Sequence, residues 1–139
     1  MPDQPVILVV DDQPKLLSGL ELTLNAAGYR VQVAEDGHLA LERLCSEAVD
    51  LILADIAMPE VDGYTFIARV RARHPDLPAI AMTAHARIED RRRALAAGYT
   101  GYRTKPIDGP QLIVDAVDLL ARRATSRFRS QHPQLSLKR

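Results

Sequence analysis

The 139-residue sequence has few of the residues that build disulfides, aromatic binding platforms and membrane spans. It contains one cysteine and no tryptophan, and only 4% of its residues are aromatic. A single cysteine excludes an internal disulfide bond and a metal site built from several cysteines. No apolar run is long enough to cross a bilayer, and residues 1–3 lead into a strand without a signal-peptide pattern. The sequence therefore predicts a cytoplasmic protein that does not enter the membrane.

Net charge is also absent, although the charged residues are unevenly distributed. Lys and Arg together equal Asp and Glu, at 18 each. Residues 1–123 contain 14 basic and 18 acidic residues, whereas residues 124–139 contain four basic residues and no acidic one. A mildly acidic body with a short basic tail does not indicate direct nucleic-acid binding. We predict one domain at residues 1–123 and a disordered basic tail at residues 124–139.

Short aliphatic runs alternate with helix-like segments along the first 123 residues. Leu17, Leu20 and Leu24 recur at helical spacing after the first run, and similar stripes follow the others. Strands are expected at residues 6–10, 30–34, 50–55, 79–83 and 101–104. Five strands alternating with five helices predict a single-domain α/β fold. Its doubly wound five-stranded parallel sheet has the flavodoxin-like order 2-1-3-4-5 and helices on both faces.

Polar side chains stand where four of the five predicted strands end. Asp11 and Asp12 follow the first strand, Asp55 ends the third, Thr83 ends the fourth and Lys105 follows the fifth. A strand-ending Asp taken alone is more often a helix cap or a turn residue. In a parallel sheet of the predicted order, however, these strand ends are neighbours, and ligands bind in the crevice outside them. The five side chains are therefore expected to converge on one pocket.

The charges of these side chains indicate the chemistry of the pocket. Three neighbouring carboxylates repel one another unless one is protonated or a divalent cation binds between them. An all-oxygen ligand set suits Mg²⁺ or Mn²⁺ rather than zinc. The cation and Lys105 would attract a phosphoryl group, a carboxylate would attack its phosphorus, and the Thr83 hydroxyl could donate to a phosphoryl oxygen. The sequence thus predicts a Mg²⁺-dependent aspartyl-phosphorylation site.

Several motifs in the same order resemble the response-regulator receiver domain of two-component signalling. The resemblance covers about residues 5–123. It rests on Val9-Val10-Asp11-Asp12, Asp55-Ile56-Ala57-Met58-Pro59 with Asp62-Gly63, Met82-Thr83-Ala84, Ala97-Gly98-Tyr99 and Lys105-Pro106. Any one of these motifs is a weak signal, but their joint occurrence at these separations is specific.

The resemblance implies a role for each residue of the predicted pocket. Asp55 would be the phosphorylated residue. Asp12 would be a direct metal ligand, Asp11 would act mainly through bound water, and the carbonyl of Ala57 would complete the protein ligands of Mg²⁺ or Mn²⁺. Lys105 would bind the phosphoryl oxygens together with Thr83.

The resemblance also implies a switch next to the pocket. The Lys105-Pro106 bond would be cis, which would aim the ammonium group into the pocket. Tyr102 would be the switch aromatic, whose ring moves inward as Thr83 is drawn towards the phosphoryl group. This movement would change the face made by the fourth helix, the fifth strand and the fifth helix.

The implied partners are proteins. A histidine kinase or a histidine phosphotransfer protein would donate the phosphoryl group in a two-component system or phosphorelay, and a downstream protein would bind the switched face. A homodimer is also compatible with the sequence. Such a domain phosphorylates and dephosphorylates itself and is not a turnover enzyme.

Three other functions fit the residues less well. A flavodoxin-type binding module needs a hydroxyl- and glycine-rich loop after the first strand, where Asp11 and Asp12 would repel a phosphate. A hydrolase of the haloacid-dehalogenase type has an Asp-x-Asp pair there and usually a cap domain, whereas this pair is adjacent and the chain is short. The third alternative is a pseudo-receiver, a non-phosphorylated protein-binding module. The complete set of five side chains argues against it.

Overall fold

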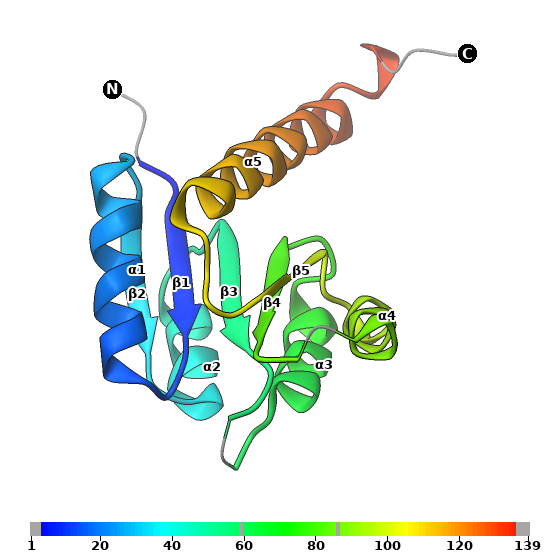
Figure 1. Cartoon of the computed structure of the whole chain (residues 1–139). Coiled ribbons are helices and arrows are strands. Elements are labelled where there is room, and N and C mark those ends of the chain that lie inside the picture. The colour runs from blue at the N-terminus through cyan, green and yellow to red at the C-terminus, as the bar shows by residue number, and fades with distance from the viewer. Residues whose placement is uncertain (1–3, 59, 86, 136–139) are drawn as a thin grey trace.

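The computed structural model describes residues 4–58, 60–85 and 87–135 of the chain. Five parallel strands form one sheet in the order β2-β1-β3-β4-β5 (Figure 1). The strands are β1 (Val6–Val10), β2 (Arg30–Ala34), β3 (Leu51–Asp55), β4 (Ala79–Thr83) and β5 (Gly101–Thr104). The predicted fold class and strand order are confirmed.

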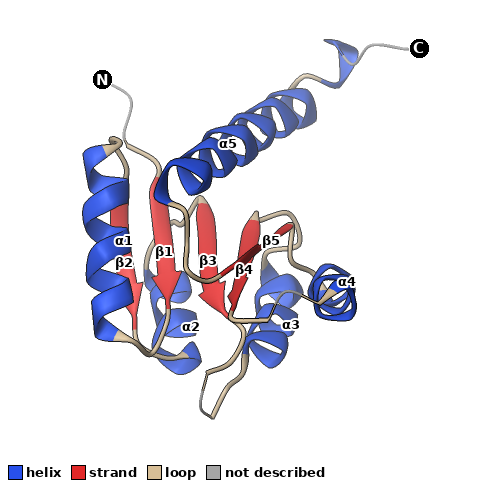
Figure 2. Cartoon of the chain, in the orientation of Figure 1, coloured by secondary structure: helices blue, strands red, loops and turns tan. Residues whose placement is uncertain are grey.

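A helix follows each strand, so that both faces of the sheet are covered (Figure 2). The helices are α1 (Pro14–Ala26), α2 (Gly37–Ser46), α3 (Gly63–Arg73), α4 (Ile88–Ala97) and α5 (Gly109–Gln131), and a short 3₁₀ helix, η1 (Pro133–Leu135), ends the described chain. Helices α1 and α5 pack on one face, and α2, α3 and α4 pack on the other. Among the described residues, no helix is both long and apolar enough to cross a membrane.

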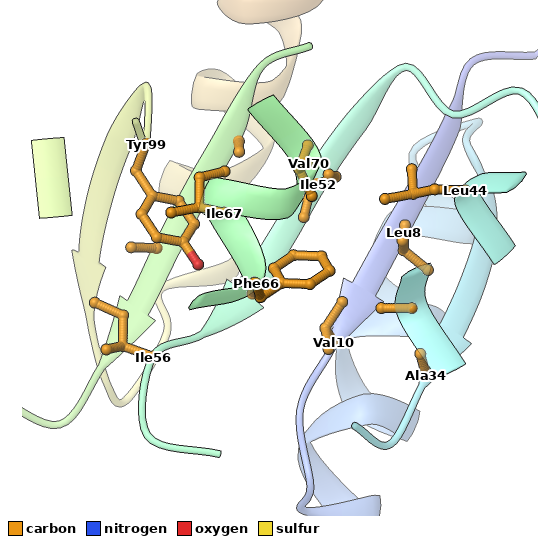
Figure 3. Close-up of a cluster of buried hydrophobic side chains, with 14 of the residues drawn as sticks. Leu8, Val10, Ala34, Leu44, Ile52, Ile56, Phe66, Ile67, Val70 and Tyr99 are labelled. Atoms are coloured by element: carbon orange, nitrogen blue, oxygen red, sulfur yellow. The ribbon is translucent and has the colours of Figure 1, made fainter. Parts of the chain in front are cut away.

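The alternation of side chains along the central strands divides the core into two layers. Leu8 and Val10 of β1 point towards Phe66 and the rest of the α2–α3 layer (Figure 3). Their neighbours Ile7 and Val9 point towards α1 and α5. Successive side chains of a strand point to opposite faces, which is why a strand covered on both faces must be apolar throughout. The polar residues of these strands are consequently confined to the strand ends.

Carboxylates hold the starts of three helices next to the strand ends. Asp36 accepts a hydrogen bond from the amide of Leu39 at 2.8 Å, and Asp62 accepts one from Thr65 at 2.8 Å. Asp108 caps α5 in the same way. Each cap satisfies an amide that the first turn of a helix leaves without a partner. These caps set where the loops after β2, β3 and β5 turn into helices.

The prediction of a disordered tail after Arg123 is wrong for the residues that the structure describes. Helix α5 continues to Gln131 and projects beyond the sheet (Figure 1). No glycine or proline interrupts residues 111–131, so the chain has no residue that breaks a helix there. Arg123 also ties this part of α5 to the domain, donating to the carbonyl of Val49 at 3.0 Å. Residues 136–139 of the predicted tail lie outside the described residues.

Candidate functional site

The carboxyl ends of β1, β3, β4 and β5 bring the predicted polar residues to one edge of the sheet. Asp11 and Asp12 directly follow β1, while Asp55 and Thr83 are the last residues of β3 and β4. Lys105 directly follows β5, and its backbone amide donates to the Thr83 carbonyl at 2.7 Å. The site therefore lies where an open parallel sheet offers a crevice to ligands.

Three carboxylates form a compact acidic cluster at this edge. Asp11, Asp12 and Asp55 each offer an oxygen atom, and these atoms all lie within 4.8 Å of one another. Asp11 is 0% exposed and Asp55 is 4% exposed, whereas Asp12 is open to solvent. A set of oxygen donors with one solvent-facing side suits a hard divalent cation that keeps several waters. The donors present therefore fit Mg²⁺ or Mn²⁺.

The ammonium group of Lys105 lies against this cluster. Its Nζ atom is 2.8 Å from Oδ2 of Asp11 and 3.5 Å from Oδ2 of Asp55. Burial on its own would lower the pKa of Lys105, but the hydrogen bond to Asp11 and the charges of both carboxylates outweigh it and raise that pKa. Lys105 is therefore a fixed positive charge that bridges two of the three carboxylates. The Lys105-Pro106 peptide bond is cis.

The surroundings of Asp55 disfavour its ionised form. Burial raises the pKa of Asp55, and the neighbouring charge of Asp11 raises it further, while Lys105 and the Ala57 amide oppose the shift. The Ala57 amide donates to Oδ1 of Asp55 at 3.2 Å. Asp11 is held differently, because its Oδ1 accepts from the Gln13 amide at 2.8 Å and its Oδ2 accepts from Lys105. A bound cation would therefore favour the ionised form of Asp55, as Lys105 does.

Thr83 and Tyr102 contact the same loop residue from two directions. Thr83 is 3% exposed, and its Oγ1 accepts a hydrogen bond from the amide of His85 at 3.1 Å. The Tyr102 hydroxyl donates to the carbonyl of the same His85. The loop after β4 thus links the hydroxyl at the pocket with the half-buried aromatic ring on β5.

One contact beside the site was not predicted from the sequence. The Tyr99 hydroxyl, in a buried position, donates to the Gly63 carbonyl at 2.7 Å. Gly63 follows the loop after Asp55, whereas Tyr99 follows α4, so 36 residues separate the two partners. The motif Ala97-Gly98-Tyr99 marks a helix end in the sequence, but nothing in it indicates where the phenol points.

Comparison with known proteins places this arrangement in a family. Residues 7–118 match the response regulator receiver domain. The chain belongs to this family. It is a receiver domain of the response-regulator type, a signalling domain of two-component systems.

Relatives of this receiver domain differ greatly in length. It is 47% identical over 109 residues to an uncharacterized 14.6 kDa protein of Leptolyngbya boryana, with 77% of this chain and 83% of that protein covered. It is 39% identical over 126 residues to the transcriptional regulatory protein GlrR of Escherichia coli, covering 88% of this chain but 28% of GlrR. For the Escherichia coli DNA-binding transcriptional regulator NtrC, the identity is 36% over 126 residues, covering 91% of this chain and 26% of NtrC. The match to these two regulators is thus a match to about a quarter of their length.

Solved structures of other receivers share the whole arrangement of the sheet. The receiver domain protein (CheY-like) of Methanospirillum hungatei has a TM-score of 0.84 at 26% identity, and the aligned part covers 89% of this chain and 99% of that one. The chemotaxis protein CheY4 of Vibrio cholerae has a TM-score of 0.80 at 28% identity, covering 84% and 99%. The family match at residues 7–118 and these structural alignments therefore cover most of the chain.

Proposed function

We propose that this receiver domain accepts a phosphoryl group on Asp55 from a phosphohistidine in a Mg²⁺-dependent reaction. One observation carries the proposal: three carboxylates with oxygens within 4.8 Å of one another lie beside an ammonium group 2.8 Å from one of them. Such a pocket combines an oxygen nucleophile with groups that neutralise a phosphoryl group. Both are needed for transfer to a carboxylate.

The residues that would hold the cation are Asp12, Asp55 and the carbonyl of Ala57, with Asp11 acting mainly through bound water. When bound, Mg²⁺ or Mn²⁺ would neutralise the negative charge that gathers on the phosphoryl oxygens. The exposure of Asp12 and Ala57 leaves room on the solvent side for the waters that Mg²⁺ retains. The acceptor Asp55 itself lies on the buried side of the acidic cluster.

In the reaction, a carboxylate oxygen of Asp55 forms a bond to phosphorus while the bond between phosphorus and the imidazole nitrogen breaks. The leaving imidazole nitrogen keeps the electron pair and is neutralised by a proton. The Lys105 ammonium and the Thr83 hydroxyl bind phosphoryl oxygens as charge develops on them. Hydrolysis of the acyl phosphate by water returns the free carboxylate, so the domain acts on itself and is not a turnover enzyme.

The output would pass through the face made by α4, β5 and α5. Movement of Thr83 towards the phosphoryl group would draw on the loop whose His85 carbonyl binds Tyr102, and the Tyr102 ring would follow. Two exposed apolar side chains of α4, Ile88 and Leu95, lie seven residues apart and therefore share one side of the helix. Large exposed apolar side chains mark protein contacts when they gather on one surface. We therefore propose a protein target here, without direct nucleic-acid binding by this domain.

The proposal extends to the context of the domain. The phosphoryl donor would be a histidine kinase or a histidine phosphotransfer protein in the cytoplasm, where ATP supplies the phosphoryl group. The receiver itself would comprise residues 1–123, and the chain beyond, including the end of α5, would be an extension of it. A homodimer of the receiver would form in addition to the contact with the downstream protein and would not replace that contact.

Intact-protein mass spectrometry after incubation with acetyl phosphate tests the proposal. The wild type is expected to gain one phosphoryl group with Mg²⁺ and none with EDTA, and Asp55→Asn is expected to gain none. Asp36→Asn is the matched control, because Asn caps a helix about as well as Asp and residue 36 lies outside the pocket. It should be phosphorylated like the wild type. Unmodified wild-type protein at every Mg²⁺ concentration would favour the pseudo-receiver instead.

A further inference from the structure

Tyr99 joins two parts of the molecule that are far apart in the sequence. Its backbone amide donates to the Ala94 carbonyl in the last turn of α4 at 3.1 Å, directly after the helix cap at Gly98. Its ring enters the core layer beside Ile67 and Ile56 (Figure 3). Its hydroxyl reaches the carbonyl of Gly63 at the start of α3. The residue is 4% exposed, so this hydrogen bond is shielded from water.

Gly63 closes the loop that leaves the phosphoacceptor. This loop, residues 56–62, begins directly after Asp55, and the Gly63 amide donates back to the Ile56 carbonyl at 2.8 Å. A Cβ atom on Gly63 would lie 2.5 Å from Cα of Ile56 and 3.0 Å from the Asp55 carbonyl oxygen. The same Cβ atom would lie 3.1 Å from the Tyr99 hydroxyl oxygen. The backbone of α3 therefore lies directly against the base of the loop, and the phenol touches the same point.

The loop carries the backbone atoms that serve the acidic cluster. The Ala57 amide donates to Oδ1 of Asp55 at 3.2 Å. The Ala57 carbonyl is the proposed backbone ligand of the cation. At the other end of the loop, the Asp62 carboxylate caps α3 by accepting from the amides of Tyr64 and Thr65. The contact of Gly63 with Ile56 therefore lies one residue from Ala57, the residue that offers both backbone atoms.

We propose that Tyr99 is a positioning residue that sets the Mg²⁺ affinity of the acidic cluster by holding the base of the loop at residues 56–62. The inference rests on the proposed function, because it takes the cluster as the Mg²⁺ site. Burial raises the pKa of Tyr99, and the charges of Asp55 and Asp62 add to this while Arg71 opposes it, so the phenol stays protonated and remains a donor to Gly63. Lys105 and Thr83 are placed by β4 and β5 and do not depend on this loop.

If Tyr99 supports the metal site but not Lys105 and Thr83, its loss should cause a specific pattern of defects. Loss of the Tyr99 hydroxyl should weaken the binding of Mg²⁺, while phosphoryl transfer at saturating Mg²⁺ should keep its rate. A general loss of packing would instead lower the free energy of unfolding, weaken Mg²⁺ binding and slow phosphoryl transfer. Because Tyr99 is also attached to the last turn of α4, a protein that binds the α4 face and Mg²⁺ should affect each other's affinity by the same factor.

The test compares Tyr99→Phe with Tyr29→Phe. The control removes a phenol hydroxyl from a half-buried tyrosine that packs on the α1–α5 face of the sheet. Calorimetric titration with Mg²⁺ in the absence of a phosphoryl donor measures affinity, and the chemical shift of the Ala57 amide reports the loop. We expect Tyr99→Phe to raise the dissociation constant about three- to tenfold, as loss of one hydrogen bond would. Its acetyl-phosphate reaction at saturating Mg²⁺ should stay within about twofold of wild type, since Lys105 and Thr83 are unchanged.

The outcomes separate this inference from the proposed function. Wild-type Mg²⁺ affinity in Tyr99→Phe, or an equal loss in Tyr29→Phe, would overturn the role of Tyr99 and leave phosphorylation of Asp55 standing. Wild-type protein that binds Mg²⁺ but never takes a phosphoryl group would overturn the proposed function alone. Wild-type protein that does not bind Mg²⁺ would overturn both.

Discussion

Strand β3 has an aspartate at each end, and the two aspartates have opposite surroundings. Asp55, at the carboxyl end, lies with Asp11 and Asp12 beside the ammonium of Lys105. Asp50, just before the strand, accepts from the Val6 amide at 2.8 Å and lies 3.8 Å from Arg123 and 4.0 Å from Arg127.

At one edge of the sheet, three carboxylates therefore share one ammonium among the described residues. At the other edge, one carboxylate faces two guanidinium groups and a backbone donor. A carboxylate that has cationic partners within the chain serves stability, whereas an excess of buried carboxylate charge favours a bound cation. The two ends of β3 thus separate a carboxylate with cationic partners from the acidic cluster of the proposed site.

Removing the one ammonium group at the site should have the largest effect. We expect Lys105→Met to slow phosphorylation by acetyl phosphate about 100-fold at saturating Mg²⁺, the usual cost of losing a donor to transition-state charge. Rates of mass gain for the variant and the wild type measure this. Lys15→Met, at an exposed position of α1, should react at the wild-type rate. A rate for Lys105→Met within a few-fold of wild type would mean that the ammonium matters only for folding.

Neutralising Asp55 and neutralising Asp50 should change the free energy of unfolding with opposite signs. In the absence of Mg²⁺ at neutral pH, Asp55→Asn should raise the free energy of unfolding by on the order of 1 kcal/mol, because it removes a buried charge next to Asp11. Asp50→Asn should lower it by a similar amount, because it leaves Arg123 and Arg127 without their carboxylate. Urea denaturation with and without EDTA measures both values.

The pH dependence of the Asp55 effect has a definite sign. The folded pKa of Asp55 lies above the unfolded value of about 3.9. The folded state therefore binds the proton more tightly. The contribution of Asp55 to the free energy of unfolding falls as the pH rises from the unfolded pKa through the folded one. The gain from Asp55→Asn should vanish at the acidic end of this window.

Mg²⁺ at about 100 times its dissociation constant should stabilise the wild type by about 2.7 kcal/mol and the variant by less. A loss of stability in Asp55→Asn at neutral pH would contradict this picture.

The smallest effects are expected at the arginines of α5. Arg123 has a side chain 17% exposed and donates to the Val49 carbonyl as well as approaching Asp50. Arg127 has a side chain 60% exposed and meets Asp50 only at 4.0 Å. We expect Arg123→Met to lower the free energy of unfolding by about 1 kcal/mol and Arg127→Met by about 0.5 kcal/mol or less, measured by urea denaturation. Equal losses in the free energy of unfolding would mean that Arg127 stabilises α5 as much as Arg123 does.

Much of this molecule could be predicted because its signals are local in the sequence. Aliphatic runs such as Ile7 to Val10 identify buried strands, and Leu17, Leu20 and Leu24 identify the inner face of α1. The right-handed crossover rule then limits the order of the strands. Since every strand of a parallel sheet points the same way, Asp55 and Thr83 had to reach the same edge.

Other features depend on contacts or surroundings that no local sequence pattern indicates. The sequence predicts a disordered tail from residue 124, whereas α5 continues to Gln131. Its amphipathic pattern fades where the helix leaves the sheet, although no residue there breaks a helix. The closer carboxylate partner of Lys105 is Asp11, 94 residues away, rather than Asp55. Strand alternation places both carboxylates at the edge but does not decide between them.

The amino-acid sequence by itself determined the receiver fold, the strand order and the five polar side chains that meet at one edge of the sheet. Only the tertiary structure decided how those charges pair, that Asp50 and Asp55 face opposite surroundings, and that Tyr99 reaches Gly63. The physical reason is distance along the chain. Periodicity and capping act over a few residues, whereas a hydrogen bond or an ion pair is chosen by whichever group the packed core brings within about 3 Å.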